Sequence, residues 1–426
     1  MAVLSVFTYS ILFRFLSEAD MGNWVFFQFA FLLLDTFRTG LLQTPLIKFY
    51  AGADAERQRA VAGAAWFIGL LVTAAFVVLN VAALPFSELV RDPGLQVLLA
   101  WFGLAMVATM PYNVALWILQ AEERFDRILW VRLINQGSFI TLIFILYVLK
   151  QVTLAHVIMA FVASSLLTSV VTTVTGWGQL RALPHRTAAV VREVFHFGKY
   201  SFGTFLCSNL LRSSDVFVIK FMLGPASLAI YNLPQRLLEI IEMPLRTGLA
   251  TAMPSMSAAV NQGKPGLVAE LLRRYVGLLT LLLLSLVVFV LVFADLVVGL
   301  IGGGKYVGTE AAGVYRILIT CSLLFPLERF LGVALDIIGR PQINLLKVIL
   351  ALVVNVTADV ICIRLTHNIY GAAWASVFTL VASTLYGYFM LRRYLPMGLR
   401  HMPEQTFVEV RGHAYDLLRR LRPARP

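Results

Sequence analysis

The sequence predicts an all-α polytopic membrane protein of about twelve transmembrane helices, in two pseudo-symmetric six-helix bundles around a central cavity. Three observations predict this fold. Of the 426 residues, 59% are hydrophobic and only 14% are charged, whereas soluble domains are about 45–50% apolar and about 25% charged. The apolar residues form long continuous runs, which favours helices over a β-barrel. A weak internal repeat divides the chain in two.

The predicted spans are the long apolar runs that are bounded by turn or charge signals. About 20 apolar residues cross a bilayer as a helix, and only the first run is shorter than this. The runs cover residues 2–16, 23–49, 60–83, 95–120, 127–149, 153–179, 198–222, 226–257, 273–301, 309–337, 343–365 and 369–391. No connection between them is long enough to hold a soluble catalytic domain.

The internal repeat supports a division into two sets of six spans. Residues 16–28 and 223–235 share the pattern L-x-x-A-x-x-small-x-aromatic-x-x-x-Q, and Pro111 in the fourth span corresponds to Pro326 in the tenth. Because six is even, the two sets have the same orientation, as in parallel-repeat transporters. The predicted organisation is an N-terminal bundle, a cytoplasmic linker, a C-terminal bundle and a basic cytoplasmic tail, at residues 1–180, 181–197, 198–392 and 393–426.

The distribution of lysine and arginine predicts the orientation in the membrane. If the N-terminus is cytoplasmic, the outer loops carry only Arg91, Lys150, Lys220, Lys305 and Arg364 of the 35 basic residues. Cytoplasmic loops are enriched in such residues, so both termini are expected in the cytoplasm. This bias also accounts for the net charge of +12. We therefore expect no nucleic-acid partner, and expect the basic tail to lie against anionic lipid headgroups.

Charged residues inside the predicted spans are the main functional signal. A charge in the hydrocarbon costs about 2.5–3.5 kcal/mol on insertion scales, so these residues must face a hydrated cavity or one another. The arginines are Arg14, Arg38, Arg212, Arg236, Arg246, Arg316 and Arg329, of which Arg14 and Arg316 lie near span ends and are expected to snorkel. The acids are Asp35, Asp215, Glu239, Glu242, Glu328 and Asp336.

Two interpretations of these charges remain open. Asp35 with Arg38 and Arg212 with Asp215 are i,i+3 neighbours, so they could be salt bridges that hold the bundle together. Alternatively, surplus arginines make the cavity cationic for an anionic substrate, since the guanidinium fork suits phosphate. On this second interpretation the substrate-binding candidates are Arg38, Arg212, Arg236, Arg246 and Arg329, and the ion-coupling candidates are Asp35, Asp215, Glu239 and Glu242.

The eighth span concentrates these features. Its four charged residues at positions 236, 239, 242 and 246 fall on one helical face. Pro234, Pro244 and Pro254 are expected to interrupt the same helix, which is tolerated where protein or water satisfies the freed backbone groups. The second, seventh and eighth spans are therefore predicted to line the cavity.

No cofactor, metal site or catalytic residue is predicted. The segment from Gly302 to Lys305 lacks the G-x-x-x-x-G-K-[ST] spacing of a phosphate loop and is expected to be a turn. The six histidines show no zinc spacing, and the three cysteines lie in apolar runs as small packing residues.

Several motifs resemble those of one family. Residues 11–22 look like the first-loop signature of the O-antigen-type polysaccharide flippases, which belong to the multidrug/oligosaccharidyl-lipid/polysaccharide exporter superfamily. The second half carries, in the family's order, Asp215, Leu223-Gly224, Ala229-Ile230-Tyr231 and Arg236-Leu237. Later landmarks are Ile301-Gly302, Tyr315-Arg316-Ile317-Leu318, Ile338-Gly339-Arg340-Pro341 and residues 370–375. The resemblance covers most of the chain.

The resemblance implies a flippase, not an enzyme, in the bacterial inner membrane. It would move an undecaprenyl-diphosphate-linked oligosaccharide to the outer leaflet by alternating access, with ion coupling in place of ATP. Such a protein would serve lipopolysaccharide or exopolysaccharide synthesis, with a polysaccharide polymerase or glycosyltransferases as possible partners. The alternatives are a multidrug/cation antiporter of the same superfamily, a peptidoglycan-precursor flippase, or a polymerase or ligase of polysaccharide assembly. The short outer loops argue against the last.

Overall fold

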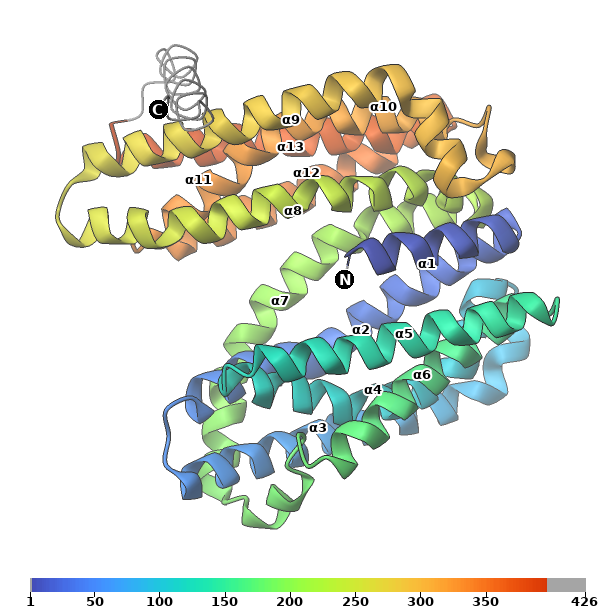
Figure 1. The fold of residues 1–426 in the computed structure, drawn as a ribbon, viewed down its shortest axis with the longest axis vertical. Helices are drawn as coiled ribbons and strands as arrows, with labels where there is room; N and C mark the ends of the chain where they lie inside the picture. Colours follow the sequence, from blue (N-terminus) through green and yellow to red (C-terminus); the bar gives the residue numbers. More distant parts are fainter. Residues whose placement is uncertain (1, 397–426) are drawn as a thin grey trace, which may run out of the picture. The chain divides into compact units, whose positions relative to one another are not determined.

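Residues 2–396 of the chain are described by a computed structural model, and the regular structure in that range is entirely helical (Figure 1). The all-α prediction is therefore confirmed. The predicted basic tail lies outside the described residues from position 397 onward.

The helices follow the predicted spans in order. The first seven are α1 (Ala2–Phe15), α2 (Glu18–Tyr50), α3 (Ala55–Ala83), α4 (Pro93–Ala121), α5 (Phe125–Val148), α6 (Leu154–Val174) and α7 (Ala188–Leu223). The later ones are α8 (Pro225–Asn261), α9 (Pro265–Gly302), α10 (Ala311–Cys321), α11 (Phe325–Ile337), α12 (Pro341–Thr366) and α13 (Tyr370–Leu391). Short 3₁₀ turns lie between some of them: η1 (Leu84–Leu89), η2 (Leu180–His185), η3 (Gly304–Tyr306) and η4 (Ser322–Leu324).

The tenth predicted span is two helices rather than one. Helices α10 and α11 are separated by η4, and Pro326 occupies the first turn of α11. Proline lacks the backbone N–H that would continue the hydrogen-bond ladder and is favoured at a helix start, so the break falls here. The corresponding Pro111 lies inside an unbroken α4.

Nine helical segments of the described range are long and apolar enough to cross a membrane: α2 to α6, α9, α10 with α11, α12 and α13. Helix α1 is shorter, with an apolar stretch of Val6–Phe15. Helices α7 and α8 have 36 and 37 residues, which is ample length. They also carry charged residues, among them those of the predicted site. These charges lower the mean hydropathy of the two helices.

Helix α8 corrects one expectation. Pro234, Pro244 and Pro254 all lie inside it, yet the helix continues from Pro225 to Asn261. A proline removes one ladder hydrogen bond and kinks a helix, but it need not end one in a membrane protein. The helical irregularity falls instead in α9, where Phe293 has φ −107° and ψ 18° without any proline.

The first compact unit comprises residues 1–232 and 301–303. Helix α2 is at its centre and packs against α3, α4 and α7. At the α2–α7 crossing, Gly198 lies against the Leu41 carbonyl and Gly40 against the Phe202 backbone, so a side chain at either glycine would collide. This close approach places α7 in the first unit. A buried core of Leu46, Trp66 and neighbouring apolar side chains joins α2, α3, α4 and α7.

The second compact unit comprises residues 233–300 and 304–426, of which the structure describes those up to 396. Helices α12 and α13 pack along each other, and α10 and α11 pack on α13. Its core includes Leu245 of α8, Leu272 of α9 and Phe330 of α11. The compact units follow packing, whereas the predicted bundles of residues 1–180 and 198–392 follow the count of spans, and that division stays a prediction.

Candidate functional site: a charged network on α8, α11 and α12

The first of the two predicted pairs, Asp35 with Arg38, lies in the interior of the first unit and is contacted by neighbouring helices. Arg38 is fully buried, and its guanidinium contacts Asp35 at 2.5 Å. It also donates to the Met106 carbonyl at 2.7 Å and to the hydroxyls of Thr109 and Thr73 at 2.8 and 3.3 Å. These partners lie on α2, α3 and α4. Arg38 therefore ties three helices together and presents no free guanidinium edge to a ligand in this conformation.

The second pair lies on α7, and its two members are placed differently. Asp215 is buried and accepts a hydrogen bond from the Tyr231 hydroxyl at 3.0 Å. Arg212 is exposed, one turn earlier on the same helix. The acid is thus held inside the unit while the arginine lies at its surface.

The stripe predicted on α8 is present as short-range ion pairs. Arg236 donates to Glu239 at 2.9 Å, and Arg246 donates to Glu242 at 2.7 Å. In the second pair the glutamate precedes the arginine by four residues, the favoured order for such a pair in a helix. The Arg246 side chain is nevertheless 70% exposed.

Glu242 links α8 to α11. Besides Arg246, it accepts from Arg329 at 3.4 Å, so one carboxylate serves two arginines. Arg329 is 53% exposed, and its Nε lies 3.7 Å from a Glu328 oxygen. Two guanidinium groups on one carboxylate leave a net positive charge at this exposed end.

The network continues into the interior of the second unit. Lys347 of α12 is only 4% exposed and donates to the Glu328 carboxylate at 2.7 Å and to its carbonyl at 3.0 Å. Ser383 of α13 donates to the same Glu328 oxygen at 3.1 Å. Two glycines make room for the lysine: a Cβ on Gly332 would lie 3.0 Å from its Nζ, and one on Gly387 would lie 3.2 Å from its Cδ.

The charged network is thus Arg246, Glu242, Arg329, Glu328 and Lys347, given in the order of their contacts, with the most exposed residue at one end and the most buried at the other. It alternates in sign and carries three cations against two anions. Its exposed end can bind an anion through the guanidinium forks, and its buried end is a hydrogen-bonded ion pair. A change in the protonation of either glutamate would change the pairing of its neighbours.

Two lysines that the sequence assigns to the two sides of the membrane are buried near the ends of helices. Lys347, expected on the cytoplasmic side, lies in α12, and Lys220, expected on the outer side, lies in the last turn of α7. Lys220 donates to Asn23 at 2.7 Å and to Asp92 at 3.0 Å. Spacing along one helix predicts neither pairing, because Glu328 and Asp92 belong to other parts of the sequence.

Arg316 pairs with Asp295 of α9 at 2.6 Å, and both side chains are exposed. Arg14 is exposed in the last turn of α1, as expected for a residue at a span end. Among the described residues, no group of three metal-ligating side chains lies close together.

Comparison with known proteins identifies the family of this chain. A family model described as "Polysaccharide biosynthesis protein" matches residues 11–311. The chain belongs to this family. No curated protein matches the sequence of this polysaccharide biosynthesis protein.

Solved structures share the fold of this polysaccharide biosynthesis protein at low identity. An inward-facing multidrug resistance MATE family transporter of the MOP superfamily has a TM-score of 0.78 and 16% identity, covering 92% of this chain and 95% of its own. The lipid II flippase MurJ in an inward closed conformation has a TM-score of 0.74 and 12% identity, covering 96% and 89%. The predicted membership in a polysaccharide family is confirmed by the family model, and these two solved structures, one of a transporter and one of a flippase, share the fold of the chain.

Proposed function

We propose that this protein is a flippase that moves an undecaprenyl-diphosphate-linked oligosaccharide from the inner to the outer leaflet by alternating access. Membership in a polysaccharide biosynthesis family supports the glycan cargo, and a fold shared with a lipid II flippase supports its movement across the membrane. The protein would lie in the bacterial inner membrane with both termini in the cytoplasm, where a polymerase would use the flipped unit for lipopolysaccharide or exopolysaccharide.

One observation carries the proposal: the two exposed arginines that share Glu242. A membrane helix can hold an exposed arginine only where the surroundings are wet, because the charge costs several kcal/mol in lipid. Arg246 and Arg329 therefore mark a hydrated surface of the second unit. Each has a planar fork that can bind two phosphate oxygens, and the two carboxylates of the network cannot neutralise its three cations.

The remaining substrate-binding candidates differ in their suitability. Arg212 is exposed, so it can reach an anionic headgroup. Arg236 is held by Glu239 and is largely buried. Arg38 is enclosed by α2, α3 and α4, so we assign it to the support of the first unit and not to the diphosphate.

Glu242 is the ion-coupling candidate with the clearest physical rationale. When ionised, it holds Arg246 and Arg329. When protonated, it would release both guanidinium groups to the diphosphate, so proton binding and substrate binding would favour each other. Asp35, Asp215 and Glu239 remain candidates, each with a different partner, whereas Glu242 contacts two exposed arginines.

The test is the double variant R246Q/R329Q of the full-length protein in proteoliposomes that contain the lipid-linked oligosaccharide. We expect the rate at which the glycan becomes accessible in the opposite leaflet to fall by at least about tenfold, because even one charged hydrogen bond contributes about 1.5–3 kcal/mol. In cells, surface polysaccharide should be lost while the lipid-linked precursor accumulates.

The matched control is R364Q, which removes an exposed arginine from the last turn of α12, outside the charged network. It should flip at the parent rate. Unchanged flipping by R246Q/R329Q would refute the assignment of the network. Export of organic cations by the same proteoliposomes, with no movement of the glycan, would instead identify a multidrug/cation antiporter.

A further inference from the structure

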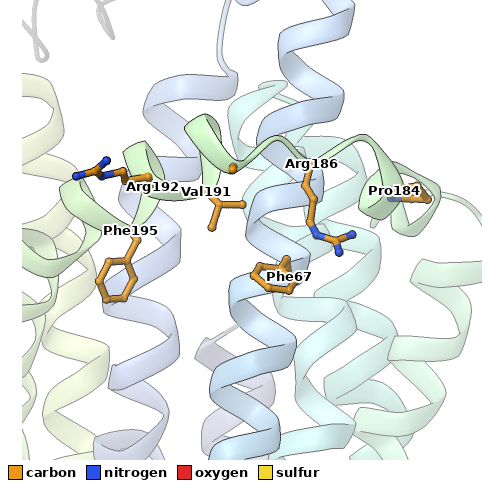
Figure 2. Close-up of a pocket in the computed structure, with 7 residues that line it drawn as sticks. Phe67, Pro184, Arg186, Val191, Arg192 and Phe195 are labelled. Atoms are coloured by element: carbon orange, nitrogen blue, oxygen red, sulfur yellow. The ribbon is translucent and has the colours of Figure 1, made fainter.

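A cavity of about 560 Å³ lies in the first unit, where α3, η2 and the start of α7 meet (Figure 2). It is separate from the charged network, which belongs to the second unit. Its volume is within the range of about 300–1,000 Å³ that is usual for small-molecule sites. None of the candidate residues from the sequence lines it.

The floor of the cavity is apolar. It is formed by Phe67 of α3 with Val191 and Phe195 of α7. In Figure 2, Val191 and Phe195 point from α7 to the side on which Phe67 lies. Phe195 is 51% exposed, so this floor offers a large aromatic surface that no part of the described chain covers.

The rim is cationic. Arg186 donates to the Leu183 carbonyl at 3.0 Å and lies 4.7 Å above the centre of the Phe67 ring. Arg192 lies on the first turns of α7 and is exposed. Within the described part of the chain, neither arginine forms an ion pair. The neighbouring Glu193 is held by another arginine, Arg57 of α3.

The rim and the floor lie at different depths along the predicted membrane segments. Both rim arginines lie in the connection of residues 180–197, outside the predicted spans, whereas Phe67 lies within the predicted span of residues 60–83. A molecule in the cavity would therefore have its polar part at headgroup level and its apolar part toward the hydrocarbon. That arrangement matches an amphiphile with a negative head.

We propose that this cavity binds an anionic phospholipid of the surrounding membrane. Its phosphate lies against Arg186 and Arg192, and its acyl chains cover the floor of Phe67, Val191 and Phe195. Arginine suits the phosphate because of its planar fork. The two rim arginines, with no acidic side chain among the residues that line the cavity, favour an anionic over a zwitterionic lipid. The proposal does not depend on the transported substrate.

The experiment is native mass spectrometry of the full-length protein, released from micelles with added phosphatidylglycerol or phosphatidylcholine. We expect the parent to retain phosphatidylglycerol preferentially, and R186Q/R192Q to bind it at least tenfold more weakly. The control is R181Q, an exposed arginine of η2 that does not line the cavity, which should bind within about twofold of the parent. F195A should weaken phosphatidylglycerol binding while leaving the charges intact.

Each other outcome overturns the proposal. Equal binding by parent and R186Q/R192Q would exclude the cavity as the site. An equal loss in R181Q would show only general surface charge, and equal retention of phosphatidylcholine would show no recognition of the anionic head. Competition by inorganic phosphate without any effect of F195A would indicate a site for a free anion. The four substituted side chains are exposed, so every variant is expected to fold. An unchanged midpoint of thermal unfolding verifies that a variant is folded. The four residues are Arg181, Arg186, Arg192 and Phe195.

Discussion

Arg38 offers the sharpest separation between a structural and a substrate-binding role. The structure shows its guanidinium enclosed on all sides, with four partners on α2, α3 and α4. The variant R38M keeps the length of the side chain but leaves the Asp35 carboxylate buried, where it still accepts a hydrogen bond from the Thr39 hydroxyl at 3.0 Å. An uncompensated buried charge of this kind costs about 3–5 kcal/mol.

The matched variant is D35L/R38M, which removes both charges together. Replacing a buried ion pair by apolar side chains is often nearly neutral, so the double variant should recover most of the loss, to within about 1–2 kcal/mol of the parent. The free energies of unfolding can be measured by titration with sodium dodecyl sulfate in mixed micelles, followed by circular dichroism. Flipping by folded D35L/R38M should persist, since the pair contacts helices and not the cargo.

Two results would refute this reasoning. If R38M unfolds with a free energy within about 1 kcal/mol of the parent, the buried guanidinium does not hold the helices together. If D35L/R38M is stable but no longer flips the glycan, Arg38 belongs to the transport machinery, as the sequence interpretation with a cationic cavity predicts.

Two further predictions concern the buried lysines. K347M should destabilise the protein by about 3 kcal/mol, because Glu328 would lose its closest cation, and K347M/E328Q should restore most of that loss in the same titration. Asp92 carries a pKa prediction: burial opposes its ionisation, but the Leu95 amide and Lys220 together hold the pKa of its carboxyl below the ordinary value of 3.8. A depressed folded-state pKa adds stability above the unfolded pKa and loses it as the pH falls through the folded one. The stability advantage of the parent over D92N should therefore be constant above about pH 5 and decrease as the pH falls below the unfolded-state pKa of about 3.9; an advantage as large at pH 3 as at pH 7 would contradict the pairing.

The sequence predicted the helices well because apolar length is a local property. Apart from the tenth, each predicted span corresponds to a single helix, since the bilayer demands about 20 apolar residues and internal satisfaction of every backbone group. Apolar length does not predict where a helix breaks, because that depends on contacts with neighbouring helices. The tenth span breaks at η4, and α8 passes through three prolines without ending.

For the charged residues too, contacts within one helix could be predicted and contacts between helices could not. Spacing predicted that Asp35 and Arg38 are neighbours and that the charged residues of α8 share one face, because residues three or four apart on a helix are close together. It could not predict that Glu242 reaches Arg329 on α11, or that Glu328 receives Lys347 from α12. Those contacts join residues 87 and 19 positions apart, and only packing brings them together.

The sequence by itself therefore determined that this is a helical membrane protein with intramembrane charges and the motifs of a polysaccharide flippase family. Composition and hydropathy suffice for that, because the membrane imposes the same requirement on every spanning segment. Only the tertiary structure decided which charges are enclosed and which are available. Arg38 is fully buried while Arg246 and Arg329 lie at the surface of their unit, because burial depends on which helices pack against each face, and a single helix does not encode that.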